Sequence, residues 1–271
     1  MANVSAILLG KKLETLREDA GMTQEGLGNL CGWPKSKVSK IENGKQGISQ
    51  MDVYGLCSIL GVPEELRIEL QRVAAEARKP GWWQPYKSVL LSEFSTLLDM
   101  EQLCSGLCGY EGELIHGLLQ TAEYARSVQF GLTDAELDKA VNTRLDRQRR
   151  FWARKGVGVR LVMHESALTR PVCGPVGDKE QLEQILHYSR RPKVGIRVVP
   201  ASVGAHPSMT SSYMIVESDT PGIASMVYTE TLREGKFGDD VGDLERHRKV
   251  FSATYDMAIP VKEWHEKRQV D

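Results

Sequence analysis

The sequence predicts an all-α N-terminal domain of five helices followed by an α+β domain with a mostly antiparallel sheet. Up to residue 79, apolar residues recur every three or four positions between capping residues, which is the period of amphipathic helices. From residue 87 to 271, helical segments alternate with short runs rich in β-branched residues, which favours strands beside helices. The Pro- and Trp-rich segment 80–86 between the two is expected to be a stiff linker.

Residues typical of helix ends indicate where the N-terminal helices begin and end. Leucines at four- and three-residue spacing form the inner face of a first helix that ends at Gly21. Thr23 can then cap a second helix, with Leu27 and Leu30 on its inner face. Three further helices are expected to begin at Pro34, Ser49 and Pro63.

The third of these helices indicates what the domain does. Val38 and Ile41 supply its core contacts, and lysines and serines lie on or beside the opposite face. A short helix that presents lysines and small hydroxyls can enter the DNA major groove, where both residue types bond base edges or phosphates. Residues 34–45 contain four lysines and one acid, although the formal net charge of the chain is −1. The positive charge is therefore local, as DNA recognition requires.

The stretch TQEGLGNLCGWPKSKVSKIENG, residues 23–44, resembles the helix-turn-helix of Xre/Cro-type phage and bacterial repressors. The resemblance extends over residues 7–62 and implies that 35–42 is the recognition helix. Pro34 stands where that family often has a capping Ser or Thr, so that hydroxyl is lost. The residue pattern and the resemblance together give these DNA contacts: Gln24, Lys35, Ser36, Lys37, Ser39, Lys40, Asn43 and Lys45. The resemblance also implies a partly buried ion pair between Arg17 and Glu42.

The number of bases that one helix can read predicts a dimer. A single recognition helix covers only about four base pairs, which is too few to find a site in a genome. Two half-sites one helical turn apart are sufficient. We therefore expect a homodimer on a double-stranded DNA operator.

The C-terminal region has a mixed pattern. Helices are expected over residues 93–107, 117–129, 134–154, 179–191 and 241–258. Strands are expected over residues 157–165, 194–200, 212–218 and 224–230.

The sequence contains no pattern that indicates catalysis. Nucleophile, phosphate-loop, dinucleotide and zinc-protease motifs do not occur, and His164-Glu165 is expected to be a structural pair at a strand end. The five cysteines form no CxxC, and the histidines lack ligand spacing, so we expect no metal, cofactor or disulfide framework. No apolar run is long enough for a membrane helix, and no signal peptide is evident. We therefore expect a cytoplasmic protein that is not an enzyme.

A second resemblance concerns the C-terminal region. The segments YEGELIHGLLQTAEYAR, RLDRQRRF, HESALTRPVCGPVGDKEQLEQIL and VGIRVVPASVGAHPSMTSSYMIV occur in this order. They resemble the large C-terminal domain of actinobacterial Xre-type regulators, in which a proline is usual at the position of His116. The resemblance implies an antitoxin-like arrangement, with a small acidic partner protein encoded beside the regulator. No catalytic residues follow from it.

An acidic partner needs a basic acceptor, and residues 144–155 (RLDRQRRFWARK) are the densest basic stretch. Arginine forks bind carboxylates, and neighbouring aromatic residues can anchor a partner. The acceptor residues are expected to be Arg144, Arg147, Arg149, Arg150, Phe151, Trp152 and Arg154. A solvated helix face paired with Asp138 and Asp146 is the competing interpretation of this stretch. The competing function is a one-component regulator whose C-terminal domain binds a small-molecule effector.

Overall fold

The computed structural model describes residues 4–78, 81–90, 94–219, 224–231, 234–238 and 240–269. The chain divides into two compact units, one over residues 1–84 and one over residues 85–218 and 224–271. The change of unit at residues 84 and 85 lies within the segment expected to be a linker. The expected boundary at residues 79 and 80 lies outside the described residues.

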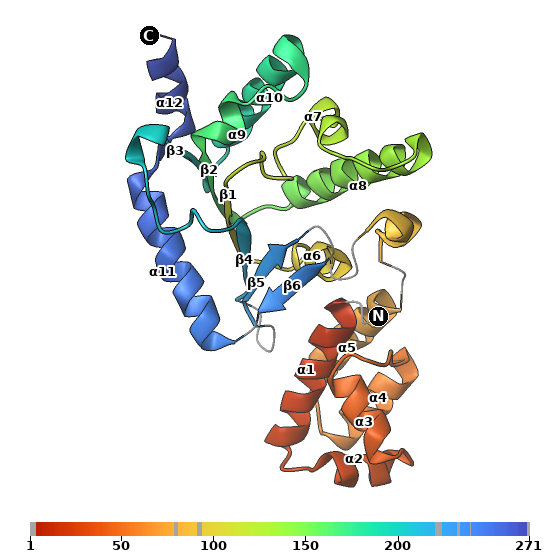
Figure 1. Ribbon diagram of the computed structural model, residues 1–271. Coiled ribbons are helices and arrows are strands. Elements are labelled where there is room, and N and C mark those ends of the chain that lie inside the picture. The colour runs from red at the N-terminus through yellow and green to blue at the C-terminus, as the bar shows by residue number, and fades with distance from the viewer. Residues whose placement is uncertain are drawn as a thin grey trace. The chain divides into compact units, whose positions relative to one another are not determined.

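The N-terminal unit contains the five helices that the sequence predicts. They are α1 (Val4–Asp19), α2 (Gln24–Cys31), α3 (Lys35–Glu42), α4 (Gln50–Ile59) and α5 (Glu64–Ala77). Figure 1 shows them in red to orange. The Thr23 hydroxyl caps α2 by accepting from the Gly26 amide, and Gly32 ends α2 in the left-handed conformation. The fold class of this unit is confirmed.

One apolar core joins the five helices. Leu9 and Leu13 of α1, Leu27 of α2 and Val38 of α3 are each at most 3% exposed. Each such side chain contributes about 1.5–3 kcal/mol relative to an exposed one. The prediction for Leu30 is wrong, because its side chain is 62% exposed. Successive residues of a helix are rotated by about 100°, so Leu27, Gly28 and Cys31 share the inner face of α2. Leu30 lies outside that face and points to solvent.

A glycine brings α1 against the end of α3. A Cβ atom on Gly10 would lie 2.3 Å from the Ile41 carbonyl oxygen and 2.5 Å from that of Glu42. The two helices can approach this closely only because position 10 has no side chain. Gly10 therefore helps to position α3 on the domain.

The C-terminal unit is built on a seven-stranded sheet, in the order β6-β5-β4-β1-β2-β3-β7 within the described residues. The strands are β1 (Gly106–Glu111), β2 (Gly158–His164), β3 (Val194–Val199), β4 (Tyr213–Glu217), β5 (Met226–Glu230), β6 (Gly235–Gly238) and β7 (Ile259–Pro260). The central strands β1, β2 and β3 are parallel to one another, and the other four pairings are antiparallel. The expected α+β class with a mostly antiparallel sheet is confirmed.

Helices cover both faces of this sheet (Figure 1). On one side, α11 (Val241–Met257) packs with Phe251 against a cluster that includes Tyr110 and Ile215. Figure 1 shows α8 (Asp134–Ala153) and α10 (Gly174–Ser189) on the other side. The remaining helices are α6 (Phe94–Met100), α7 (Ala122–Ser127), α9 (Glu165–Thr169) and α12 (Val261–Arg268), with short 3₁₀ turns at Gln84–Val89 and Ala201–Val203.

The helix predicted over residues 93–107 is wrong in its second half. The helix α6 ends at Met100, and β1 begins at Gly106. Residues 107–110 are buried on both sides of the strand. A strand buried on both faces has a continuous apolar run without alternation, and periodicity cannot distinguish such a run from a buried helix.

We predict that Gly10→Ala destabilises the N-terminal unit by about 1–3 kcal/mol, because the new methyl group overpacks the contact between α1 and α3. Gly55→Ala in α4 is the matched control, because a Cβ atom there meets no heavy atom within 4 Å. That control should be neutral or stabilise by about 0.5–1 kcal/mol, the usual gain from replacing a helical glycine. Urea unfolding of both variants measures the difference. Equal effects would show that position 10 is not tightly packed.

Candidate functional site

The exposed face of α3 presents the lysine and serine side chains. Lys35, Ser36 and Lys40 are exposed, whereas Val38 and Ile41 are each 3% exposed. Pro34 precedes the helix without a side-chain cap bond, so the first amides of α3 face solvent without a capping hydroxyl. The structure therefore places lysines and open amides at the start of this helix, where they can meet an anion.

The other predicted DNA contacts lie around this helix. Lys37 is half-buried, with its ammonium 3.6 Å from the centroid of the Trp33 ring. Asn43 is exposed and donates from Nδ2 to the Ser39 carbonyl oxygen at 2.8 Å, which closes the end of α3. Ser39 is half-buried, and Lys45 is exposed in the turn that follows. No sequence pattern indicated the Trp33 contact, which holds the Lys37 ammonium beside the helix.

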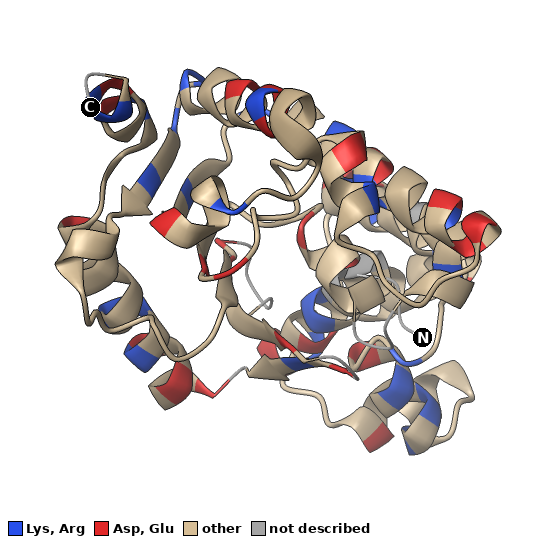
Figure 2. Cartoon of the chain, turned by 45° about the horizontal axis from the view of Figure 1, so that its top comes forward, with Lys and Arg blue, Asp and Glu red and all other residues tan. Residues whose placement is uncertain are grey.

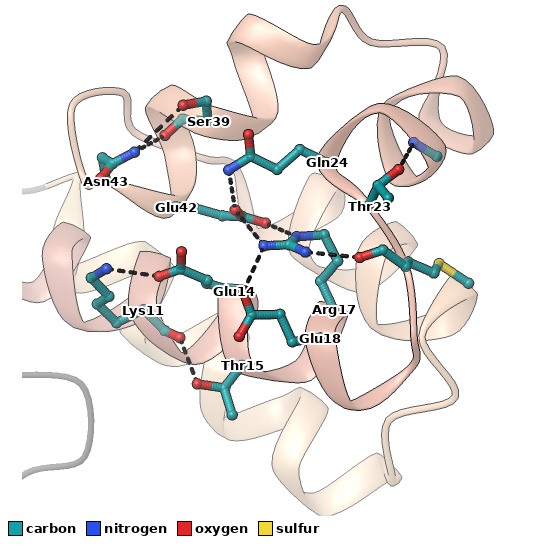
Figure 3. A network of polar contacts seen from close by, with 12 residues as sticks. Lys11, Glu14, Thr15, Arg17, Glu18, Thr23, Gln24, Ser39, Glu42 and Asn43 are labelled. Atoms are coloured by element: carbon teal, nitrogen blue, oxygen red, sulfur yellow. Dashed lines mark hydrogen bonds and ion pairs between the residues drawn. The ribbon is translucent and has the colours of Figure 1, made fainter.

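A buried polar network fixes α3 against α1 and α2 (Figure 3). Arg17 donates from Nε to Oε1 of Glu42 at 2.6 Å and from Nη2 to Oε2 at 3.1 Å. The side chains of this pair are only 7% and 2% exposed. Arg17 also donates from Nη1 to the Met22 carbonyl oxygen at 2.8 Å. The network thus links the last turns of α1 and α3 with the segment that leads into α2.

Arg17 remains charged because Glu42 accepts two of its hydrogen bonds. The hydrogen bond to Glu42 raises the pKa of Arg17 and outweighs the opposing effect of burial. Bidentate geometry is the strongest arrangement of a guanidinium with a carboxylate. The orientation of α3 therefore depends on a desolvated ion pair in addition to apolar packing.

Gln24 has a structural contact in addition to its expected role at DNA. Its side-chain amide donates from Nε2 to Oε2 of Glu42 at 2.8 Å (Figure 3). A carboxamide nitrogen carries two hydrogens, so this bond leaves its second N–H unused. The backbone amide of Gln24 lies in the first turn of α2, where helix amides are open to an anion. The phosphate contact of Gln24 therefore stays a prediction.

The predicted acceptor for an acidic partner is wrong for most of its residues. Arg147 is 4% exposed and forms a bidentate pair with the fully buried carboxylate of Glu101, at 2.8 and 2.6 Å. Phe151 and Trp152 are 1% and 9% exposed. The amphipathic face of α8 that carries these residues packs into the domain, and a guanidinium enters the interior there because Glu101 neutralises it.

Two further arginines of this stretch are also used internally. Arg144 donates to the side chain of Gln120, and burial, followed by the neighbouring Arg147, lowers its pKa to about 10. Arg154 donates from Nη2 to the Cys104 carbonyl oxygen at 2.6 Å. Only Arg149 and Arg150 of the expected acceptor are exposed. The expected acceptor surface is thus largely interior.

His116 is a buried structural residue. Its Nδ1 accepts from the Leu118 amide at 3.2 Å, so Nε2 carries the proton and lies 3.0 Å from the Met214 sulfur. Burial, and then the charges of Arg147 and Arg144, hold the pKa of His116 well below its usual value. His116 is therefore neutral and shapes the turn before α7.

His164 and Glu165 lie at the end of β2, as the sequence predicts, and they do not face each other as an acid–base pair. His164 caps the short helix α9, because its Nδ1 accepts from the amide of Ser166 and contacts the Ser166 hydroxyl. Glu165 accepts from the Ala201 amide at 2.7 Å and from Nε1 of Trp264 at 3.0 Å. Both residues therefore hold local structure. In the parts of the chain that the structure describes, no group of three His, Cys, Asp or Glu side chains is arranged to bind a metal ion.

The exposed basic helix α3, packed behind α2 and oriented by buried charges, defines a helix-turn-helix DNA-binding protein. Comparison with known families supports this class, because a helix-turn-helix domain model matches residues 8–70. A domain of unknown function (DUF5753) matches residues 94–266. That match covers more than half of the chain, so the chain belongs to the DUF5753 family and carries a helix-turn-helix domain at its N-terminus.

No curated protein matches the chain. Among the helices of the described residues, none is long and apolar enough to cross a membrane. In Figure 2, basic and acidic stretches alternate along the helices, in agreement with a net charge near zero. The lysines of α3 and its flanks are therefore a local concentration of positive charge in a nearly neutral chain.

We predict that Glu42→Ala and Arg17→Ala each destabilise the N-terminal unit by about 3–5 kcal/mol, because each leaves a buried charge without its partner. Replacing both residues together by apolar ones should cost less than the sum of the two single losses. Lys11→Ala is the control, because its ion pair with Glu14 lies on the surface and such pairs contribute about 0–1 kcal/mol. Thermal melts of the four proteins test the coupling, and strictly additive losses would contradict it.

Proposed function

We propose that this regulator binds a specific operator sequence through α3, as a homodimer on two half-sites. The observation that carries the proposal is the exposed face of α3, which presents Lys35, Ser36 and Lys40. The buried ion pair of Arg17 and Glu42 holds this helix in place. Lysine reads guanine edges and serine bonds either bases or phosphates, so this face can distinguish sequences. Lys45 and the backbone amide of Gln24 flank the helix where phosphates would lie.

Lys35→Ala and Lys40→Ala should each weaken operator binding by about 1–3 kcal/mol and relax specificity at one or two positions. Lys45→Ala should instead weaken operator and random DNA alike and reduce the salt slope by about one unit. Lys139→Ala is the control, because it removes an exposed lysine of α8 in the C-terminal unit. It should change neither the affinity for DNA nor the salt slope. Fluorescence anisotropy at several salt concentrations, on an operator obtained by selection from random DNA, measures all four variants. Intact operator binding by Lys35→Ala and Lys40→Ala at physiological salt would show that another surface reads the DNA.

The homodimer is tested by separate experiments on the same operator. Footprinting on the selected operator should show two half-sites whose centres are about 34–36 Å apart, one turn of the duplex. Binding isotherms should be second order in protein at low concentration, and sedimentation should give two chains per operator. A single protected half-site with one chain bound would contradict the homodimer.

We further propose that the C-terminal unit regulates DNA binding by binding a ligand or partner and is not an enzyme. The family resemblance favours a small acidic protein, whereas the burial of Arg147, Phe151 and Trp152 leaves little of the expected acceptor for it. A small-molecule effector is favoured by a hollow of about 230 Å³ beside the end of α8. Co-purification of a stoichiometric acidic protein with the native chain would support the first candidate and contradict the second as the main signal.

A further inference from the structure

The hollow beside the end of α8 is bounded by two loops of the C-terminal unit. One loop connects α8 to β2 and contains Arg154, Lys155 and Val157. The other connects α10 to β3 and contains Arg191. The volume is about 230 Å³. At roughly 20–30 Å³ per heavy atom, near the share of a water molecule in the liquid, about ten heavy atoms fill it.

The inner wall of the hollow is apolar and rigid. Phe151 and Trp152 line it, and their rings meet edge to face with centroids 5.2 Å apart. The Trp152 ring stacks on Tyr188 of α10 at 4.5 Å, and its Nε1 donates to the Leu118 carbonyl oxygen at 2.9 Å. A wall fixed on several sides can receive a flat or apolar group without rearrangement.

The rim of the hollow is cationic. Arg154, Lys155 and Arg191 line the hollow, and the same two loops also carry Arg190 and Lys193. The sequence has no acidic residue between Asp146 and Glu165, or between Glu183 and Glu217. Within the described ranges, no ion pair joins any of these five cations to a carboxylate. Basic loops without neutralising acids are a site for an anion.

The rim is also held in place. Arg191 donates from Nη2 to the Trp152 carbonyl oxygen at 2.8 Å, and its guanidinium lies 5.0 Å from the centre of the Trp152 ring. Lys193 donates from Nζ to the Gly156 carbonyl oxygen at 3.3 Å, which joins the two loops. Lys193 has a φ of 63°, and it is the only described non-glycine residue with a positive φ. A non-glycine residue held in the left-handed region is often found at binding sites, where the surrounding structure maintains it.

We propose that this hollow binds a small organic anion, a carboxylate or phosphate attached to an aromatic or other apolar group of about ten heavy atoms. The apolar group packs on the accessible apolar residues of the hollow, Val157, Pro192 and Val194, which the buried Phe151 and Trp152 support from behind. The anionic group meets Lys155 and Arg191 at the rim. The apolar wall favours this ligand over the DNA backbone, which has charge and no apolar group to insert. Ligand binding in this hollow does not require that the protein bind DNA. Only the use of the ligand in regulation rests on the proposed function.

Isothermal titration of the full chain tests the site with phenyl phosphate and indole-3-acetate as probes. Each should bind once per chain with a dissociation constant below about 1 mM, the weak end of ordinary affinities. Inorganic phosphate lacks the apolar group, and indole-3-acetamide lacks the charge, so each should bind at least tenfold more weakly. Absence of binding by both anionic probes, or equal binding of inorganic phosphate, would overturn the proposal.

Two variants locate the site. Lys155→Glu reverses a charge at the rim, on an exposed side chain, and should weaken both anionic probes at least tenfold. Val157→Trp fills the hollow without changing its charge and should do the same. Lys249→Glu, at an exposed position of α11, is the matched charge control and should bind like the native chain. Circular dichroism verifies folding. Undiminished binding by both folded variants, or an equal loss in Lys249→Glu, would overturn the assignment.

A DNA titration separates this site from the proposed function. Lys155→Glu without probe should bind the selected operator as the native chain does, with the same salt slope. A weaker affinity and a flatter slope would identify the rim as a DNA contact and overturn the proposal. If a probe binds but leaves operator affinity unchanged, the anion site stands and its regulatory use is contradicted. Failure of the native chain to bind any selected operator would instead contradict the proposed function.

Discussion

The recognition helix depends on one buried interaction, the bidentate pair of Arg17 and Glu42. An eight-residue helix has little stability of its own, because short isolated helices are marginal in water. Val38 and Ile41 attach α3 to the core, and the ion pair fixes the end of that helix to α1. Gln24 adds a hydrogen bond from α2 to the same carboxylate. The helices α1, α2 and α3 are therefore linked through the single carboxylate of Glu42, and the exposed lysines of α3 take no part in this link.

The C-terminal unit uses the same device at a different place. Arg147 of α8 and Glu101 after α6 form a second buried bidentate pair, on the side of the sheet opposite α11. This pair, with the hydrogen bonds of Arg144 and Arg154, turns a basic stretch of sequence into an interior one. The positive charge that remains exposed near the end of α8 is that of Arg149, Arg150 and Lys155. Cations in both units thus divide into those that hold the fold and those that face solvent.

The net charge of the chain does not show this difference between structural and solvent-facing cations. Acidic and basic residues are nearly equal in number, yet the only acid of α3 is the buried Glu42, and the loops around the hollow contain none. DNA and small organic anions are both recognised by local charge, which acts over about a Debye length of 8–10 Å at physiological salt. A nearly neutral regulator can therefore bind anions at two places without a generally basic surface. Such a surface would favour non-specific binding over selection.

Three features could be predicted from the residues alone: the five N-terminal helices, the exposed lysines and serines of α3, and the mixed class of the C-terminal unit. Those features follow from local rules, because capping residues, glycines and 3.6-residue periodicity act within one element. Tertiary contacts determine that β1 replaces part of a predicted helix, that Leu30 points outward and that Arg147 of α8 lies inside. They also determine that Gln24 binds Glu42 and that two distant loops form one hollow. These outcomes depend on partners such as Glu101, which lies 46 residues before Arg147, and no pattern within one element specifies a contact at that separation.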